Sequence, residues 1–334
     1  MNAVIQVLFN TPKFADYFLQ KYKYEKKTMS NEMSLILKIL SDDIGEKIFH
    51  SPVEFKRVLG NEDKSFAGFQ ANDPKDLIIY LLDKFHKENN DPPKLNNQNY
   101  NFLNNVNQYN SAEVFQDFYL RIYSQNKSII SELFYGMNQR TTTCTKCNSI
   151  LYDYEIFSFL LFDLKQIKDF ILKKNQGNSL EKKDEIFSEI NLNDCFDFEQ
   201  RIKQDDSAQF YCNICKCNMI QNEVKKIYHL PKYLIIILYR KKGDTYDFKV
   251  NFPENLNLNN YVAIDPQPME LYAVICHFGQ NDFSGHFAAY CKHRKTQEWY
   301  YYKDVEVTKC NEKNPYYDGI PYILFYRTVE QEFN

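Results

Sequence analysis

The amino-terminal part of the chain has apolar residues at the spacing of helices. Val4, Ile5, Leu8 and Phe9 lie in pairs about four positions apart, so they form one apolar face of a helix. Pro12 follows and would end that helix. Similar faces recur up to about residue 135, and this part of the chain is therefore predicted to be helical.

A well-capped helix is predicted to begin at Pro74. Asp73 is a good N-cap, and proline suits the first helical position. Asp76 adds a negative charge to the first turn, where the helix dipole favours it. The stretch is complete as a structural helix, so its carboxylates need no further function to explain them. Its apolar stripe consists of Leu77, Ile78, Leu81, Leu82 and Phe85.

From about residue 136 the pattern changes to that of strands. Short apolar runs, some alternating with polar residues, are typical of strands packed on one or both faces. A charged stretch from Lys173 to about residue 184 predicts a surface loop. Helices followed by strands, without internal repeats, predict a single α+β domain spanning residues 1–334. The expected strands include Leu151–Leu164, Tyr233–Tyr239, Leu271–Cys276, Phe287–Cys291 and Trp299–Tyr302.

The composition is that of an ordinary globular protein, with 44% hydrophobic and 25% charged residues. A net charge of −3 argues against a general binder of nucleic acids or of anionic membranes, so neither is expected as a partner. No apolar run approaches the roughly 18 residues of a membrane span, and no signal peptide is visible. The expected location is therefore the cytosol, the nucleus or both.

Nine cysteines, an odd number without a secretory signal, indicate metal ligation and free thiols rather than a disulfide framework. Cys144 and Cys147 form one C-x-x-C pair, and Cys212 and Cys215 form a second, the spacing with which two thiolates bind one zinc ion. Each pair lies between β-prone segments, as two hairpin tips would. Two pairs arising by chance remain the alternative, and Cys217 is interpreted as a bystander.

Two further residues with catalytic chemistry lie on a predicted hairpin. His286 precedes the run Phe287–Cys291, and Asp304 follows the run Trp299–Tyr302. Antiparallel pairing of the two strands would set the Asp304 carboxylate against the His286 imidazole. That contact orients the ring and fixes its tautomer, as a histidine serving a nucleophile requires. A hairpin without a catalytic role has the same pattern, so spacing alone leaves both interpretations open.

Three motifs around this hairpin resemble the histidine box of the ubiquitin-specific proteases, a large family of cysteine deubiquitinases. Residues 1–9 resemble the segment that follows the nucleophile in the family's cysteine box, and S-I-I-S-E-L-F-Y-G at 128–136 resembles another family motif. The resemblance covers nearly the whole chain, in order. The three histidine-box motifs are H-F-G at 277–279, S-G-H-F-A-A-Y at 284–290 and W-Y-Y-Y-K-D-V-E-V at 299–307.

The resemblance implies a papain-like cysteine protease architecture with a helical thumb, a β-rich palm and zinc-ribbon fingers. It also implies a monomer whose partners are ubiquitin and ubiquitinated proteins. The expected thumb is 1–135, the fingers are 136–160 and 205–230, and the palm is 161–204 and 231–334. The expected site residues are His286 as general base and then acid, Asp304 as its orienting partner, Asp73, Asp76, His277 and Gly285 as substrate contacts, and Cys144, Cys147, Cys212 and Cys215 as ligands of a structural Zn²⁺.

The resemblance places the catalytic cysteine two residues before Met1, and the family's oxyanion-hole asparagine also upstream. The chain as written is therefore expected not to hydrolyse ubiquitin. An incomplete gene model is favoured over a pseudoenzyme that binds ubiquitin without cutting it, because His286 and Asp304 keep the family pattern. A zinc-stapled structural domain with no role in ubiquitin recognition is a third alternative, which would leave the motifs unexplained.

Overall fold

The protein is described by a computed structural model. The described residues are 1–21, 28–41, 50–68, 70, 72–93, 103, 110–175, 189–240, 248–281, 284–311 and 315–329.

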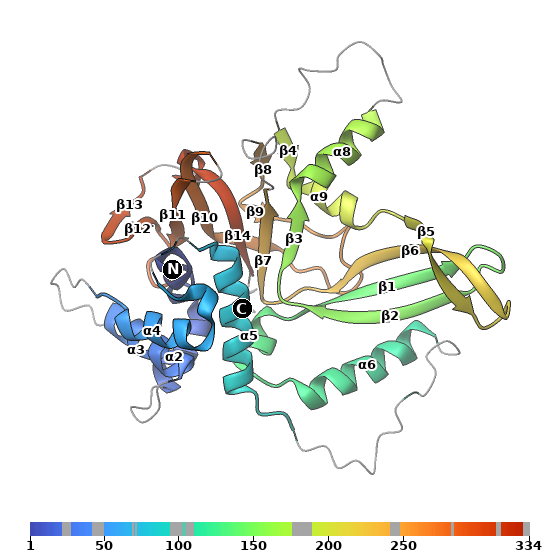
Figure 1. The fold of residues 1–334 in the computed structure, drawn as a ribbon, viewed down its shortest axis with the longest axis horizontal. Helices are drawn as coiled ribbons and strands as arrows, with labels where there is room; N and C mark the ends of the chain where they lie inside the picture. Colours follow the sequence, from blue (N-terminus) through green and yellow to red (C-terminus); the bar gives the residue numbers. More distant parts are fainter. Residues whose placement is uncertain are drawn as a thin grey trace, which may run out of the picture.

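Helices make up the amino-terminal part of the fold, called the thumb below (Figure 1). The predicted helical character is confirmed, although Pro12 starts the second helix directly after the first has ended. Asp73 caps α5 through its side chain, with Pro74 as the first helical residue, as predicted. The helices are α1 (Asn2–Phe9), α2 (Pro12–Lys21), α3 (Met29–Ser41), α4 (Val53–Glu62), the 3₁₀ turn η1 (Lys64–Phe66), α5 (Pro74–Asn89), α6 (Ser111–Gln125) and α7 (Ile129–Phe134).

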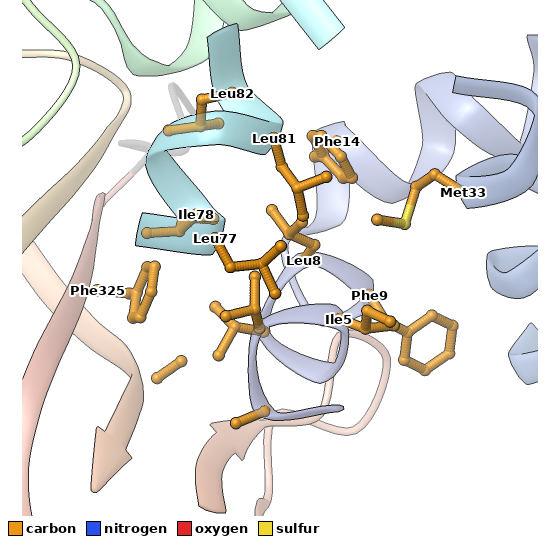
Figure 2. Packing of buried hydrophobic residues seen from close by; sticks show 14 of the residues in the cluster. Ile5, Leu8, Phe9, Phe14, Met33, Leu77, Ile78, Leu81, Leu82 and Phe325 are labelled. Atoms are coloured by element: carbon orange, nitrogen blue, oxygen red, sulfur yellow. The ribbon is translucent and has the colours of Figure 1, made fainter. Parts of the chain in front are cut away.

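Helices α1–α5 and α7 are joined by one apolar core. Figure 2 shows side chains from different helices converging, among them Leu8 of α1, Phe14 of α2, Met33 of α3 and Leu81 of α5. All four are at most 1% exposed. Burying a large aliphatic or aromatic side chain contributes about 1.5–3 kcal/mol, so this cluster fixes the position of α1. The amino end of α1 is thereby held against the palm.

The palm is an eight-stranded sheet with the order β13-β12-β11-β10-β14-β7-β3, and β9 pairs with β10 outside that path. Neighbouring strands are antiparallel except for β3 and β7. Since β10, β11 and β12 are consecutive neighbours, the predicted hairpin is present. The strands are β3 (Leu160–Asp163), β7 (Tyr233–Tyr239), β9 (Asn255–Leu256), β10 (Met269–Asn281), β11 (Ser284–Lys292), β12 (Trp299–Lys303), β13 (Glu306–Lys309) and β14 (Ile320–Thr328).

Both faces of the central palm strands β7, β10 and β14 are buried, which explains their continuously apolar sequences. In β7, Ile235 and Ile237 belong to the core shared with the thumb, whereas Leu234, Ile236 and Leu238 belong to a second core. The second core also contains side chains of α8 and α9. The elements on this side are α8 (Leu164–Asn175), α9 (Leu192–Glu199), η3 (Pro315–Asp318) and a small sheet of β4 (Glu189–Asn191) and β8 (Lys249–Asn251).

Helix α8 corrects one expectation. It continues to Asn175, so the first residues of the loop predicted from Lys173 are helical, and residues 176–184 of that loop lie outside the described ranges. Among the described helices, none combines the length and the apolar character needed to cross a bilayer.

A second sheet, called the fingers below, extends away from the thumb and palm, and α6 runs along it (Figure 1). Aromatic side chains join α6 to this sheet, with the rings of Phe115 and Tyr228 4.7 Å apart and the hydroxyls of Ser111 and Tyr154 2.8 Å apart. The strand order is β2-β1-β6-β5, and the strands are β1 (Gly136–Cys144), β2 (Ile150–Phe157), β5 (Lys203–Cys212) and β6 (Cys217–His229).

Candidate active site and metal centre

The predicted pair of His286 and Asp304 is brought together at one end of the palm sheet. His286 lies near the start of β11, and Asp304 lies in the tight turn between β12 and β13. The turn requires a φ of 50° at Asp304, a left-handed conformation that aspartate adopts more readily than most residues. His286 Nε2 is 3.2 Å from Asp304 Oδ2. The other ring nitrogen, Nδ1, is therefore the one left to exchange a proton with a substrate or nucleophile.

The two side chains lie close together, but their geometry is not that of a normal hydrogen bond. His286 Nε2 is shielded from solvent, yet it makes no hydrogen bond of normal geometry in the described structure. Catalytic hydrogen bonds are often poorly aligned in the absence of substrate. A small rotation of the ring or of the Asp304 carboxylate would align the pair.

The amino end of α1 reaches the same place. Asn2 Nδ2 donates a 3.4 Å hydrogen bond to Asp304 Oδ1. Burial lowers the pKa of the Met1 α-amino group, as does the nearby Lys56, and Asp304 acts in the opposite direction. A residue attached ahead of Met1 would thus begin beside His286 and Asp304, at the positive end of a helix dipole that favours an anion.

Asp73 and Asp76 lie at the amino end of α5, but their environments differ. Asp73 Oδ1 accepts the Lys75 backbone N–H at 2.7 Å, and Asp73 Oδ2 accepts the Tyr322 hydroxyl at 2.6 Å. Asp76 has an exposed side chain that is ion-paired with the Lys75 ammonium. Asp73 is therefore fixed in place, whereas Asp76 is free to reorient. Their contact with substrate remains a prediction.

His277 and Gly285 lie against each other next to His286. His277 is 8% exposed and pairs across β10 and β11 with Phe287. Burial lowers the pKa of His277, the His286 ring acts in the same direction and Asp73 opposes both, which favours a neutral ring at neutral pH. A Cβ on Gly285 would lie 2.2 Å from His277 Nε2. Gly285 is thus needed because the ring occupies the space of a side chain. A role of either residue in binding substrate remains a prediction.

No described cysteine is placed to serve as the nucleophile. Cys276 and Cys291, the thiols nearest to His286 in sequence, are both fully buried, and burial raises the pKa of each thiol. The Cys276 thiol donates to the Tyr316 carbonyl instead. Both are therefore core residues, as predicted, and poor candidates for a thiolate at neutral pH.

The four predicted metal ligands meet at the tip of the fingers. Their sulfur atoms all lie within 4.8 Å of one another. The sulfur–sulfur distance is 3.9 Å between Cys144 and Cys215, and 3.6 Å between Cys147 and Cys212. A tetrahedral ion with metal–sulfur bonds of about 2.3 Å requires about 3.8 Å. These residues could therefore hold a zinc-sized ion with little movement.

The two cysteine pairs have matching backbone geometry. The N–H of Asn148 donates to the Cys144 carbonyl, and the N–H of Lys216 donates to the Cys212 carbonyl, at 3.0 and 2.8 Å. Asn148 and Lys216 have φ values of 54° and 56°. The Ser149 hydroxyl, together with the Cys215 N–H, lowers the pKa of the Cys212 thiol and so favours the thiolate that a metal binds. Cys217 lies opposite Cys212 on β6 but outside the cluster.

A helical thumb on a buried palm sheet, a His–Asp pair where they meet and four clustered cysteines on a finger sheet together define the fold class of the ubiquitin-specific proteases. The chain belongs to the ubiquitin carboxyl-terminal hydrolase family, whose family model matches residues 1–326.

The individual relatives have low sequence identity to this chain. The chain is 24% identical over 340 residues to ubiquitin carboxyl-terminal hydrolase Usp2 of Drosophila melanogaster, covering 98% of this chain and 33% of that protein. It is 27% identical over 352 residues to human ubiquitin carboxyl-terminal hydrolase 2, covering 98% and 53%. The chain thus spans between a third and about half of these two relatives.

Solved structures have the same fold. A SAGA DUB module of Ubp8, Sgf11, Sus1 and Sgf73 bound to monoubiquitin contains a chain that matches with a TM-score of 0.71 and 18% identity, over 99% of this chain and 66% of that one. The module bound to ubiquitin aldehyde matches with a TM-score of 0.68 and 18% identity, over 99% and 67%. At this identity the likeness concerns the fold.

Two contacts of the site were not predicted from the sequence. The sequence predicts Asn2 only as part of a helix and predicts no role for Tyr322. Each meets its carboxylate partner across more than 240 positions of the chain. The local signal for Asn2 is its position in residues 1–9, which resemble the family's cysteine box.

Proposed function

We propose that this chain is the catalytic domain of a cysteine-type deubiquitinase, which hydrolyses the isopeptide bond after the last glycine of ubiquitin. The observation that carries the proposal is the contact between His286 Nε2 and Asp304 Oδ2 beside the amino end of α1. A thiol at that helix end would be adjacent to an oriented imidazole. The membership of the chain in the ubiquitin carboxyl-terminal hydrolase family supports the reaction class.

The residues have defined roles in this proposal. His286 Nδ1 takes the proton from the thiol, so that the thiolate attacks the carbonyl carbon of the isopeptide bond. His286 then donates the proton to the departing lysine amine, and a water molecule activated by the same ring releases ubiquitin. Asp304 holds Nε2 in both steps. The positive end of α1 stabilises the thiolate.

The described residues include no thiol that is placed to act as the nucleophile. We therefore propose that these residues bind ubiquitin without hydrolysing it, and that a cysteine introduced at the amino end of α1 would complete the site. A binding protein without hydrolase activity is the second candidate, favoured by the burial of Cys276 and Cys291.

We also propose that Cys144, Cys147, Cys212 and Cys215 hold one structural Zn²⁺. Four thiolates fill a tetrahedral shell, so no position remains for a catalytic water. The ion would instead join the hairpin tips of β1–β2 and β5–β6, which are also connected through the β1–β6 pairing. All four ligands come from one chain, so a monomer can form this metal site.

A ubiquitin titration tests the recognition part of the proposal. Wild-type chain should bind ubiquitin and should bind a ubiquitin that lacks its carboxyl-terminal tail more weakly. Asp76→Asn should weaken binding of intact ubiquitin by about two- to fivefold, the size of an exposed charge contact. Asp83→Asn is the matched control, because Asp83 lies on the same helix, has a similarly exposed side chain of 55% against 59%, and is likewise paired with a lysine. Equal binding of both forms of ubiquitin would refute the proposed recognition.

A further inference from the structure

Tyr322 connects the thumb to the palm beside Asp73, one of the predicted substrate contacts. It lies on β14, is 7% exposed, and donates its hydroxyl to Asp73 Oδ2 at 2.6 Å. The other oxygen of Asp73 caps α5. One carboxylate therefore joins the first turn of a thumb helix to a palm strand.

The ring of Tyr322 also contacts the strand that carries His286. It lies 5.4 Å from the ring of Phe287, which in turn lies 4.7 Å from the ring of His277. His277 occupies the space against Gly285. Tyr322 thus contacts the Asp73 carboxylate through its hydroxyl and Phe287, the residue after His286, through its ring.

The choice of partner for this hydroxyl is informative. A buried tyrosine hydroxyl needs an acceptor, and a backbone carbonyl satisfies that need at lower desolvation cost than a carboxylate. Tyr326 on the same strand does so, donating to the Pro253 carbonyl at 2.7 Å. Tyr322 instead binds a charged group, which after accepting both hydrogen bonds still has about two of its four lone-pair positions available.

We propose that Tyr322 is a positioning residue for recognition of the ubiquitin tail, whose hydroxyl holds the Asp73 carboxylate and the amino end of α5 in the orientation that accepts the tail. The role rests on the proposed function. Without the hydroxyl, Asp73 can rotate about its side-chain bonds, and α5 loses its polar link to β14. Tail recognition weakens while the folded core is retained.

Tyr322→Phe tests this role, with Tyr326→Phe as the matched control. Both variants remove one buried hydroxyl from β14 and keep the ring, so we expect similar losses in thermal stability. Only Tyr322→Phe should weaken the binding of intact ubiquitin, by about tenfold or more, as expected for a hydrogen bond to a charged group. The difference between the two variants should vanish with tail-less ubiquitin.

Asp73→Asn provides a second test that does not depend on Tyr322→Phe alone. If Tyr322 acts through Asp73, the double variant should bind ubiquitin about as weakly as Asp73→Asn, whereas independent sites would give additive losses. Additive losses, unchanged binding by Tyr322→Phe, or an equal loss toward tail-less ubiquitin would overturn the positioning role. Absence of ubiquitin binding by the wild-type chain would instead overturn the proposed function, and this role with it.

Discussion

Replacing Gly285 with alanine would place a methyl group inside the space of the His277 ring. The new Cβ would lie 2.2 Å from Nε2 and 2.4 Å from Cε1 of His277, and 2.7 Å from the Phe278 carbonyl oxygen. Ordinary contacts of this kind are longer than about 3.4 Å. The backbone of Gly285 does not have a left-handed φ, so the requirement for glycine is one of space.

The cost follows from how little these neighbours can move. The His277 ring would have to retreat by about 1 Å, yet it is packed against Phe287 and almost fully buried. The Phe278 carbonyl belongs to the paired backbone of β10. Forcing an extra methyl group into such a site costs about 1–3 kcal/mol. At roughly 2–4 °C per kcal/mol for a large domain, the melting temperature should fall by several degrees.

Thermal and urea unfolding of Gly285→Ala, His277→Ala and the double variant measure this effect. Removing the ring makes room for the methyl group, so Gly285→Ala should cost less in the His277→Ala background than in the wild type. A residual cost should remain from the Phe278 carbonyl. If the two single costs are simply additive, the ring does not determine the need for glycine and the steric reasoning is refuted.

Two further predictions concern the metal centre and the pH. Purified protein should contain about one zinc ion per chain. The Cys212→Ser variant should lose the ion, and its amide exchange should speed up first in β1, β2, β5 and β6, whereas Cys217→Ser should retain the ion. Wild-type protein without zinc would contradict the assignment. Burial lowers the pKa of His86 and His277, so below about pH 6.5 the unfolded chain binds more protons than the folded one. The free energy of unfolding should therefore be highest above about pH 6.5 and should fall as the pH drops through the lower folded-state pKa values. The fall should be smaller in His86→Gln. Urea midpoints that do not change between about pH 7 and pH 5.5 would contradict this expectation.

Local chemistry made several elements predictable from the sequence. Asp73 and Pro74 specify the start of α5 because capping depends on neighbouring residues alone. The apolar run Tyr233–Tyr239 predicts a strand buried on both faces, and β7 is such a strand. The two C-x-x-C pairs predict a common site because each already has the geometry of half a zinc shell.

Other features have no local signal. Strand β13 is exposed along its whole length, so it has no apolar pattern to detect. Strands β10 and β11 continue beyond their apolar runs to the pair Asn281 and Ser284, because backbone pairing continues where burial ends. The link between Asp73 and Tyr322 and the packing of His277 against Gly285 depend on tertiary contacts, which a single sequence does not display.

The proposed catalytic mechanism is tested most directly by supplying the nucleophile. An N-T-C-Y segment added ahead of Met1 would place a cysteine two positions upstream, at the amino end of α1, and release of a fluorophore from the ubiquitin carboxyl terminus measures turnover. We expect thiol-dependent hydrolysis that is lost when the new cysteine or His286 is replaced by alanine, the latter by about 10²–10⁴-fold, and that falls strongly in Asp304→Ala. An extended chain that folds and binds ubiquitin but stays inert, or turnover that does not depend on His286, would contradict the placement of the active site.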